Sequence, residues 1–252
     1  MTTPIKNKSQ ERTLTTTSFA VLSVLSLRDH STYDLIRQMR LSMHYMWPRA
    51  ESNVYAEPRR LVAAGLATAR EEWNGQRRRT VYSITEAGRA ALVEWLASPS
   101  ARQRYECEAL VKVLFAENGT REELLASIRA LGEDAADIMK HFLRIADRYA
   151  TDDGEYPSRF GLSGLVGRLL MEQQAATLRW ATWAEQVAAS WETPLYQDAA
   201  WGVETLRATG EPLPLNEDPV RQIVGSASLG DAHGRGGGPS DAPSATRRRR
   251  TP

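Results

Sequence analysis

The sequence predicts a mainly α-helical protein with two folded parts: an N-terminal module of four helices and a two-stranded antiparallel hairpin, followed by an antiparallel hairpin of two long helices. Three observations support this prediction. Helix caps and apolar residues at helical spacing recur along the chain, one Asn-Gly turn separates two β-prone segments, and two apolar stripes with heptad spacing fill the middle of the chain. The predicted divisions are a flexible N-terminus over 1–13, the first module over 14–98, a helical module over 99–209 and a disordered tail over 210–252.

Composition excludes several classes of protein. The 252 residues are 42% hydrophobic and 25% charged, and no apolar run approaches the roughly 20 residues of a membrane-spanning helix. Cys107 is the only cysteine, which excludes an intrachain disulfide and a cysteine-based zinc cluster. The polar segment Met1–Arg12 lacks the apolar stretch of a secretory signal. We therefore expect a cytoplasmic protein that does not contact a membrane.

The charge is distributed unevenly between the predicted parts. The net charge is only +1, but residues 1–98 carry 14 Lys/Arg against 9 Asp/Glu, whereas residues 99–209 carry 12 against 17. A basic first module beside an acidic second one indicates different partners, and a polyanion would prefer the first.

The first two helices are predicted from their caps. Thr16, Thr17 and Ser18 offer N-cap oxygens to a dense apolar segment that runs to Leu27. The stretch Ser31-Thr32-Tyr33-Asp34 has the form of a capping box and begins the second helix.

The third helix is predicted over Ser52–Leu66, with Ser52 as the N-cap and Gly65 as the left-handed stop. Pro58 conflicts with this interpretation, since a proline inside a helix deletes one backbone hydrogen bond and costs about 3 kcal/mol. Two alternatives follow: the helix kinks at Pro58, or it begins only near Glu57 with Pro58 in its first turn.

A β-hairpin and a fourth helix complete the first module. Residues 67–73 and 79–84 are predicted strands, and the intervening Asn74-Gly75 tolerates the positive backbone dihedrals of a tight turn. Thr85 then caps a helix that ends at Ser98-Pro99.

The second module is predicted to be helical throughout. After a short helix near residues 107–117, the capping box Thr120–Glu123 precedes apolar residues that step by 4 and 3 from Leu124 to Tyr149, and a second stripe runs from Leu162 to Val187. Two such stripes joined by a polar turn have more apolar surface than one hairpin can cover, which favours a homodimer.

Catalytic motifs are lacking. The four histidines have no metal-site spacing, no Gly-x-Ser-x-Gly or phosphate-loop lysine occurs, and adjacent acidic pairs suit helix caps and turns better than acid–base chemistry. We expect no enzyme activity, no cofactor and no metal site.

The order of elements in the basic module is that of a winged helix-turn-helix, in which the third helix enters the major groove and the hairpin, or wing, contacts the backbone or minor groove. We therefore expect it to bind double-stranded DNA. Asn53 is a candidate for reading base edges, Ser52 and Tyr55 for bonding phosphates, and basic residues for neutralising them. These basic residues are Arg59, Arg60, Arg77, Arg78 and Arg79. The alternatives are a Tyr55 that belongs to the core and arginines that are only solvated.

Several motifs occur in a specific order along the chain. They are Tyr33-Asp34-Leu35, Trp47-Pro48, Ser52-x-x-Tyr55, Arg59-Arg60-Leu61-x-x-x-Gly65-Leu66 and Val81-Tyr82-Ser83-Ile84-Thr85-Glu86-Ala87-Gly88. With them, residues 14–192 resemble the PadR family of bacterial transcriptional regulators. The resemblance implies that Tyr55 lies in the recognition helix, that the helical module forms a homodimer, and that the protein represses a neighbouring operon until a small molecule relieves the repression. On this basis Tyr33 joins the predicted DNA contacts.

A two-fold dimer would hold two recognition helices about 34–36 Å apart and would bind a palindromic operator. The predicted interface consists of Leu124, Ile128, Leu131, Phe142, Leu162, Val166, Leu169, Trp180 and Trp183. Flat rings also suit a small aromatic effector, with Trp95, Trp180, Trp183 and Trp191 as candidates. The alternative is that the tryptophans are plain interface core.

A competing hypothesis from another class is a helical dimerisation protein whose winged module mediates protein contacts. DNA binding would differ from it by a steep dependence of affinity on salt concentration.

Overall fold

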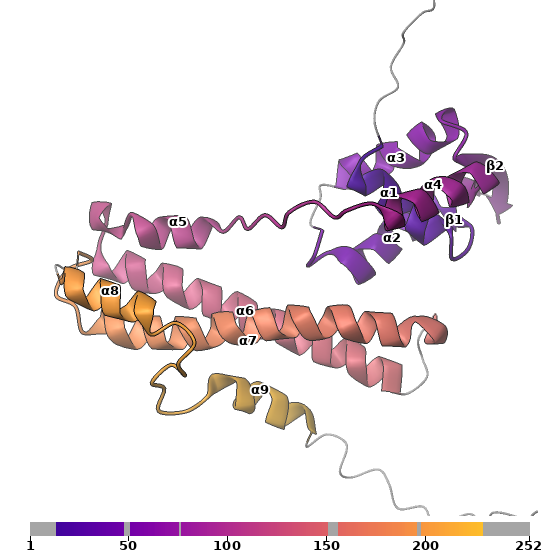
Figure 1. Ribbon diagram of the computed structural model, residues 1–252. Helices are drawn as coiled ribbons and strands as arrows, with labels where there is room; N and C mark the ends of the chain where they lie inside the picture. The colour runs from indigo at the N-terminus through magenta and orange to yellow at the C-terminus, as the bar shows by residue number, and fades with distance from the viewer. Residues whose placement is uncertain (1–13, 48–50, 76, 151–155, 196–197, 229–252) are drawn as a thin grey trace, which may run out of the picture. The chain divides into compact units, whose positions relative to one another are not determined.

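The computed structural model describes residues 14–47, 51–75, 77–150, 156–195 and 198–228. The chain divides into two compact units, residues 1–104 and residues 105–252. The architecture is mainly helical, with one small antiparallel sheet in the first unit and a long helical hairpin in the second (Figure 1). This fold class is the one that the sequence predicts.

Within the described residues, the first unit contains four helices and three strands. In chain order they are α1 (Thr16–Leu25), β1 (His30–Ser31), α2 (Thr32–Met43), α3 (Glu51–Ala63), β2 (Ala67–Asn74), β3 (Arg77–Ile84) and α4 (Glu86–Ala97). The strands form an antiparallel sheet in the order β1-β3-β2. The strand β1 is an addition to the predicted hairpin, because two residues are too few for an alternating pattern to reveal.

The helix caps follow local side-chain chemistry. The hydroxyl of Ser31 accepts from the Asp34 amide at 3.2 Å and caps α2, as predicted. For α1 we expected the cap among Thr16, Thr17 and Ser18, and this was wrong by one residue: Thr15 is the N-cap, and its hydroxyl accepts from the Ser18 amide at 3.3 Å. The Ser18 hydroxyl in turn accepts from the Thr15 amide at 3.0 Å, which completes a capping box.

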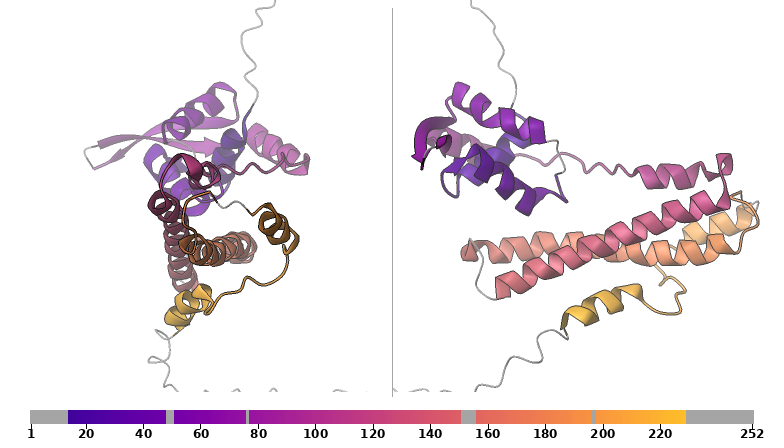
Figure 2. Two further views of the ribbon diagram at one scale, coloured as in Figure 1. Left: turned by 90° about the vertical axis from the view of Figure 1, so that its left-hand side faces the viewer. Right: turned by 180° about the vertical axis from the view of Figure 1, so that it is seen from behind.

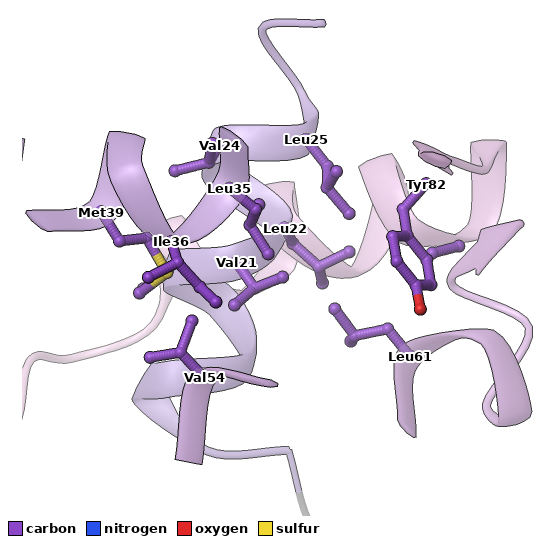
Figure 3. Close-up of a cluster of buried hydrophobic side chains, with 12 residues drawn as sticks. Val21, Leu22, Val24, Leu25, Leu35, Ile36, Met39, Val54, Leu61 and Tyr82 are labelled. Carbon is purple, nitrogen blue, oxygen red and sulfur yellow. The ribbon is translucent and has the colours of Figure 1, made fainter. Parts of the chain in front are cut away.

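The core of the first unit holds α3 against its neighbours. Side chains from α1, α2, α3 and β3 converge on a single cluster, in which Leu22, Leu35 and Leu61 are fully buried and Tyr82 is nearly so (Figure 3). Each such side chain contributes about 1.5–3 kcal/mol when it leaves water. This packing fixes which face of α3 points outward.

Pro58 lies inside α3, since the helix begins at Glu51 and continues through it to Ala63. The alternative of a helix that begins near Glu57 is therefore wrong. The proline ring is fully buried, and its apolar burial offsets the lost backbone hydrogen bond. The helix then ends as predicted: Gly65 has φ +72°, its amide donates to Val62 O at 3.0 Å, and the Leu66 amide donates to Leu61 O at 2.9 Å.

The β2–β3 hairpin is longer and tighter than predicted. The strands pair up to Asn74↔Arg77, which leaves a two-residue loop with Gly75 at φ +62°. The predicted loop over 74–78 is therefore wrong: Arg77 and Arg78 belong to β3 rather than to a loop, and Arg79 lies in this strand as predicted. In the left view of Figure 2 the hairpin extends beyond the helices of its unit.

The second unit is built on two antiparallel helices of 30 residues each. Its elements are α5 (Glu108–Leu114), the 3-10 turn η1 (Ala116–Asn118), α6 (Arg121–Ala150), the 3-10 turn η2 (Pro157–Arg159), α7 (Phe160–Ala189), α8 (Ala199–Arg207) and α9 (Pro219–Ser228). The predicted capping box at the start of α6 is confirmed: the Glu123 amide donates to the Thr120 hydroxyl at 3.2 Å, and the Thr120 amide donates to Glu123 Oε2 at 2.7 Å. No helix in the described ranges is long and apolar enough to cross a membrane.

The predicted disordered tail over 210–252 requires a correction. Residues 219–228 form α9, which packs against α6 and α7 (Figures 1 and 2), while residues 229–252 lie outside the described part of the chain. Asp218 accepts from the Val220 amide at 3.1 Å and Pro219 occupies the first helical position, where its missing amide proton costs nothing. Val220 then enters a cluster with Met139 and Ala175. The high Gly and Pro content of residues 210–252 predicted disorder, although this segment includes a capped amphipathic helix.

Candidate nucleic-acid interface

The helix α3 has one buried face and one exposed face. Its buried residues are spaced at i, i+3, i+4 and i+7, and they are Val54, Glu57, Pro58 and Leu61. Tyr55 and Arg59 lie one turn apart on the opposite face, and 49% of the Tyr55 side chain is exposed. Tyr55 is therefore no core residue. The structure does not describe the side chains of Ser52 and Asn53, so their roles stay predictions.

Arg59 and Arg60 are adjacent but differ in their surroundings. Arg59 forms no ion pair with any residue that the structure describes. Arg60 Nη1 donates to Glu57 Oε1 at 2.5 Å, and the buried Glu57 accepts a second bond from the Ser18 hydroxyl at 2.9 Å. A buried carboxylate needs such partners to offset its desolvation. Arg60 is therefore a partner of the buried carboxylate that links α3 to α1, whereas Arg59 is exposed and has no ion pair among the described residues.

Tyr33 is exposed at the start of α2, where 73% of its surface is accessible. The neighbouring Ser31 cap fixes the first turn of this helix, since the Ser31 hydroxyl also donates to Asp34 Oδ2 at 2.7 Å. Tyr33 therefore lies on a rigid helix end, with its hydroxyl open to an external acceptor.

The wing carries a ladder of ion pairs. Arg79 Nη2 lies 3.1 Å from Glu72 Oε2, directly across the two strands, and Arg70 Nε lies 2.9 Å from Glu72 Oε1. Arg78 pairs with Glu71. These side chains are partly exposed, and exposed ion pairs each contribute only about 0–1 kcal/mol to folding. The side chain of Arg77 is not described.

A second link ties the wing to the turn before β1. Arg70 Nη1 donates to Asp29 Oδ2 at 2.6 Å and to the Ser83 hydroxyl at 2.8 Å. The hydrogen bond from Arg70 lowers the pKa of Asp29, with a further contribution from Ser83, and hydrogen bonds from Arg70 and Arg79 lower the pKa of Glu72. Both carboxylates therefore stay charged at neutral pH, and Arg70 is bound on both sides.

Arg70 and Trp73 are two residues of this surface that sequence reasoning missed. Trp73 stands next to the loop of the hairpin, opposite Arg78 in the strand register, and 72% of its surface is exposed. The exposure of Trp73 could have been predicted from sequence, because a large apolar side chain so near a predicted turn cannot reach the core. Arg70 was hidden because its partners come from three separate segments.

The candidate effector residues pack mostly within the chain. Trp95 stacks on Phe19, with ring centroids 4.9 Å apart. Trp183 lies parallel to Trp201 of α8 at 6.4 Å, and Trp191 meets the Trp201 ring edge-on at 5.7 Å. Trp180 and Trp183 of α7, and Trp191 just after this helix, pack against the cluster formed by α6 and α7. Trp201 of α8, which sequence reasoning missed, contacts two of these rings.

The predicted dimer residues fall into two groups. Leu124 and Ile128 are buried against α7 of the same chain, with Trp180 and Trp183 beside them, and Leu131 and Phe142 are half-buried. The N-terminal half of α7 differs, because its apolar stripe is exposed. The stripe consists of Leu162, Leu165, Val166 and Leu169, which are 42–74% exposed.

In the described residues no three His, Cys, Asp or Glu side chains are grouped as metal ligands. An exposed recognition-helix face beside an arginine-bearing wing, on the basic part of the chain, defines a winged-helix DNA-binding protein. Comparison with known families makes the assignment specific. The model of the PadR-like transcriptional regulator family matches residues 21–94, and that of the virulence activator alpha C-terminal domain matches residues 107–188. Residues 21–94 therefore belong to the PadR-like family, and the chain is a DNA-binding transcriptional regulator.

Solved structures show the same fold. PadR of Bacillus subtilis in complex with operator DNA is 19% identical, with a TM-score of 0.59 over 70% of this chain and 98% of that one. The Vibrio cholerae virulence activator AphA is 28% identical, with a TM-score of 0.51 over 69% and 96%. The protein smu.1604c of Streptococcus mutans UA159 is 19% identical, with a TM-score of 0.60 over 68% and 98%. A further structure of the Bacillus subtilis PadR contains p-coumaric acid, with 19% identity and a TM-score of 0.53 over 69% and 98%.

No curated protein sequence matches the chain. Both family models end by residue 188, so α8 and α9 lie outside them.

Proposed function

We propose that the protein is a homodimeric repressor that binds a palindromic operator near its own gene and is released by a small aromatic effector. The observation that carries the proposal is the exposed Tyr55–Arg59 face of α3, held outward by the buried face of the same helix. A regulator of chromosomal genes acts where the DNA is, so we place the protein in the cytoplasm.

The DNA contacts divide by chemistry. In this proposal Asn53 reads base edges, Ser52, Tyr55 and Tyr33 bond phosphates, and a set of arginines neutralises phosphate charge. This set consists of Arg59, Arg77, Arg78 and Arg79. Trp73 adds a flat apolar group at the wing tip, of the kind that lies against sugars or wedges between base steps in the minor groove.

A second copy of the chain is the proposed occupant of the α7 stripe. Leu162, Leu165, Val166 and Leu169 are spaced at i, i+3, i+4 and i+7, which is one helix face. A second exposed apolar patch consists of Val111 and Leu114 on α5 and of Phe115, the residue that follows this helix. The α5 patch is near the start of α6, whereas the α7 stripe is near the far turn of the hairpin, where Tyr149 stacks on Phe160 at 4.3 Å. A two-fold axis across the hairpin would bring each patch onto the other copy.

The effector proposal is supported by chemistry and by a relative. The Bacillus subtilis PadR has been solved with p-coumaric acid, a small aromatic acid. In this chain Trp183 and Trp191 are partly exposed aromatic rings on the unit proposed to dimerise. Titration with p-coumaric acid as the probe, followed by tryptophan fluorescence and by release of bound operator, tests this part.

Fluorescence anisotropy tests DNA recognition. The full-length protein is titrated against duplexes that tile the DNA upstream of its own gene, with random duplex as competitor, at two salt concentrations. One palindromic duplex bound at least about 10³-fold more tightly than random DNA is the expected result. No preference for any duplex, together with weak salt dependence, would favour a winged module that mediates protein contacts.

Transcription in vitro from the operator-bearing promoter tests the direction of regulation. Repression predicts fewer transcripts as protein is added and recovery when the effector is present. An increase in transcripts would identify an activator instead.

A further inference from the structure

The wing carries positive and negative charges in contact with one another. Each described arginine of the hairpin has a carboxylate partner: Arg78 pairs with Glu71, Arg79 with Glu72, and Arg70 with both Glu72 and Asp29. Arg59 on α3 has no such partner in the described part of the chain. The recognition helix and the wing therefore differ in how readily their arginines meet a phosphate.

The two pairs nearest the tip lie on opposite faces of the hairpin. Residues alternate along a strand, so Glu71 and Arg78 share one face, whereas Glu72 and Arg79 share the other, where they are direct partners in the register. Each face of the wing thus carries at least one guanidinium that is already hydrogen-bonded to or in contact with a carboxylate, since Arg70 shares the face of Glu72 and Arg79. Whichever face of the hairpin meets DNA, a carboxylate accompanies the arginine.

These pairs are poorly suited to stabilising the fold. The side chains are between 32% and 63% exposed, and ion pairs in such surroundings add little to stability. They have a larger effect on a phosphate. An arginine that turns to DNA must leave its carboxylate, and that carboxylate remains within a few ångströms of the phosphate and repels it.

We propose that Glu71 and Glu72 restrain the wing arginines and so limit the affinity of the protein for DNA of any sequence. This inference rests on the proposed DNA-binding function and assigns a role to two residues that oppose binding. Sequence-independent affinity depends almost entirely on phosphate contacts, and non-operator DNA is in vast excess in a genome. When the wing attracts phosphates less strongly, recognition of the operator depends mainly on the contacts of α3.

The test is the double variant Glu71→Gln/Glu72→Gln, which keeps the side-chain shape and removes both charges. Anisotropy titration of a random duplex over a series of salt concentrations is expected to give about tenfold tighter binding at low salt and a steeper dependence of log K on log salt. The matched control is Glu94→Gln on α4, which removes an exposed charge of the same unit that lies outside the hairpin. Thermal unfolding of each variant confirms that the fold is kept.

A double-mutant cycle identifies the cause of the gain. In an Arg78→Ala/Arg79→Ala background the two glutamine substitutions are expected to give much less tightening, because two of the three arginines paired with Glu71 and Glu72 are gone and only Arg70 remains. Equal tightening in that background, equal tightening by Glu94→Gln, or no tightening at all would each overturn the inference. The two hypotheses can fail separately. If the wild-type protein prefers no upstream duplex, the proposed function is wrong, but the random-duplex titration still tests whether Glu71 and Glu72 restrain the wing arginines.

Discussion

Two adjacent residues of one type can have unrelated roles, and Arg59 and Arg60 are an example. From the sequence, both are predicted to neutralise phosphates, as basic residues near the end of the recognition helix. The structure separates them, because Arg60 is hydrogen-bonded to the buried Glu57 and Arg59 is not. This difference could not be predicted from sequence, since the burial of Glu57 depends on Ser18, 39 positions away in the chain.

Alanine substitution at these two positions should separate affinity from stability. Arg59→Ala should weaken DNA binding by about tenfold and reduce its salt dependence by about one phosphate, with little change in stability. Arg60→Ala should lower the free energy of unfolding by about 1–2 kcal/mol, because it leaves Glu57 short of a charged hydrogen bond. Anisotropy titration and urea denaturation of both variants check this. The assignment is contradicted if Arg59→Ala is the destabilised variant.

Trp73 should matter for DNA and not for folding. Its surface is 72% exposed, so Trp73→Ala removes no core contact and should leave the unfolding midpoint unchanged within error. Loss of its ring at the wing tip should weaken operator binding several-fold, and Trp73→Phe should restore part of that loss because a flat ring remains. Operator affinity that is equal in all three proteins would remove Trp73 from the interface.

Most helices and strands could be predicted because their ends are set by local chemistry. The caps at Ser31, Thr85 and Thr120 and the stop at Gly65 are each readable from a few neighbouring residues. The elements that could not be predicted depend on contacts between residues that are distant in the chain. The strand β1 exists only because β3 pairs with it, and the helix α9 only becomes stable where Val220 meets α6 and α7.

The junction between α3, the wing and α4 depends on a single glycine. A Cβ placed at Gly88 would lie 2.1 Å from Leu66 O, a backbone atom that also accepts from the Thr85 amide at 3.1 Å. We expect Gly88→Ala to destabilise the first unit by about 2–3 kcal/mol, because the first turn of α4 must move. Gly202→Ala is the control, since its Cβ would meet open space and should stabilise α8 slightly. Thermal unfolding of both variants measures the difference, and equal midpoints would refute the close approach.

Docking of α9 should depend on acid pH through one ion pair. Arg179 donates to both oxygens of Asp218, at 3.0 and 2.9 Å, and this hydrogen bonding lowers the pKa of Asp218 below its ordinary value of 3.8. The contribution of the pair is therefore fully present above pH 3.8 and is lost as the pH falls through the lowered pKa. The protection factors of the α9 amides, which correct for the intrinsic pH dependence of hydrogen exchange, should fall in that acid range. In Asp218→Asn this pH step should be absent, and an unchanged step would place its cause elsewhere.

The whole molecule combines a DNA-binding unit of limited affinity with a unit proposed to pair. If two copies bind two half-sites, the second contact forms at a high effective concentration, so operator affinity far exceeds that of one unit. Random DNA gains less, because its affinity needs no half-site spacing. Substitutions in the apolar stripe of α7 should therefore weaken operator binding more than they weaken binding to random DNA.

Charges introduced into this stripe provide the test. Leu165→Asp/Leu169→Asp places two carboxylates on a face that is exposed in one chain, so each chain should fold, whereas a dimer would have to bury them at a high cost. Sedimentation should show monomers, and operator affinity should fall more than about 100-fold while random-duplex affinity per chain changes little. Leu206→Asp on α8, also exposed but outside the stripe, should remain dimeric and bind the operator normally. A double variant that stays dimeric would move the interface to another face, and a monomer with full operator affinity would show that one unit suffices for recognition.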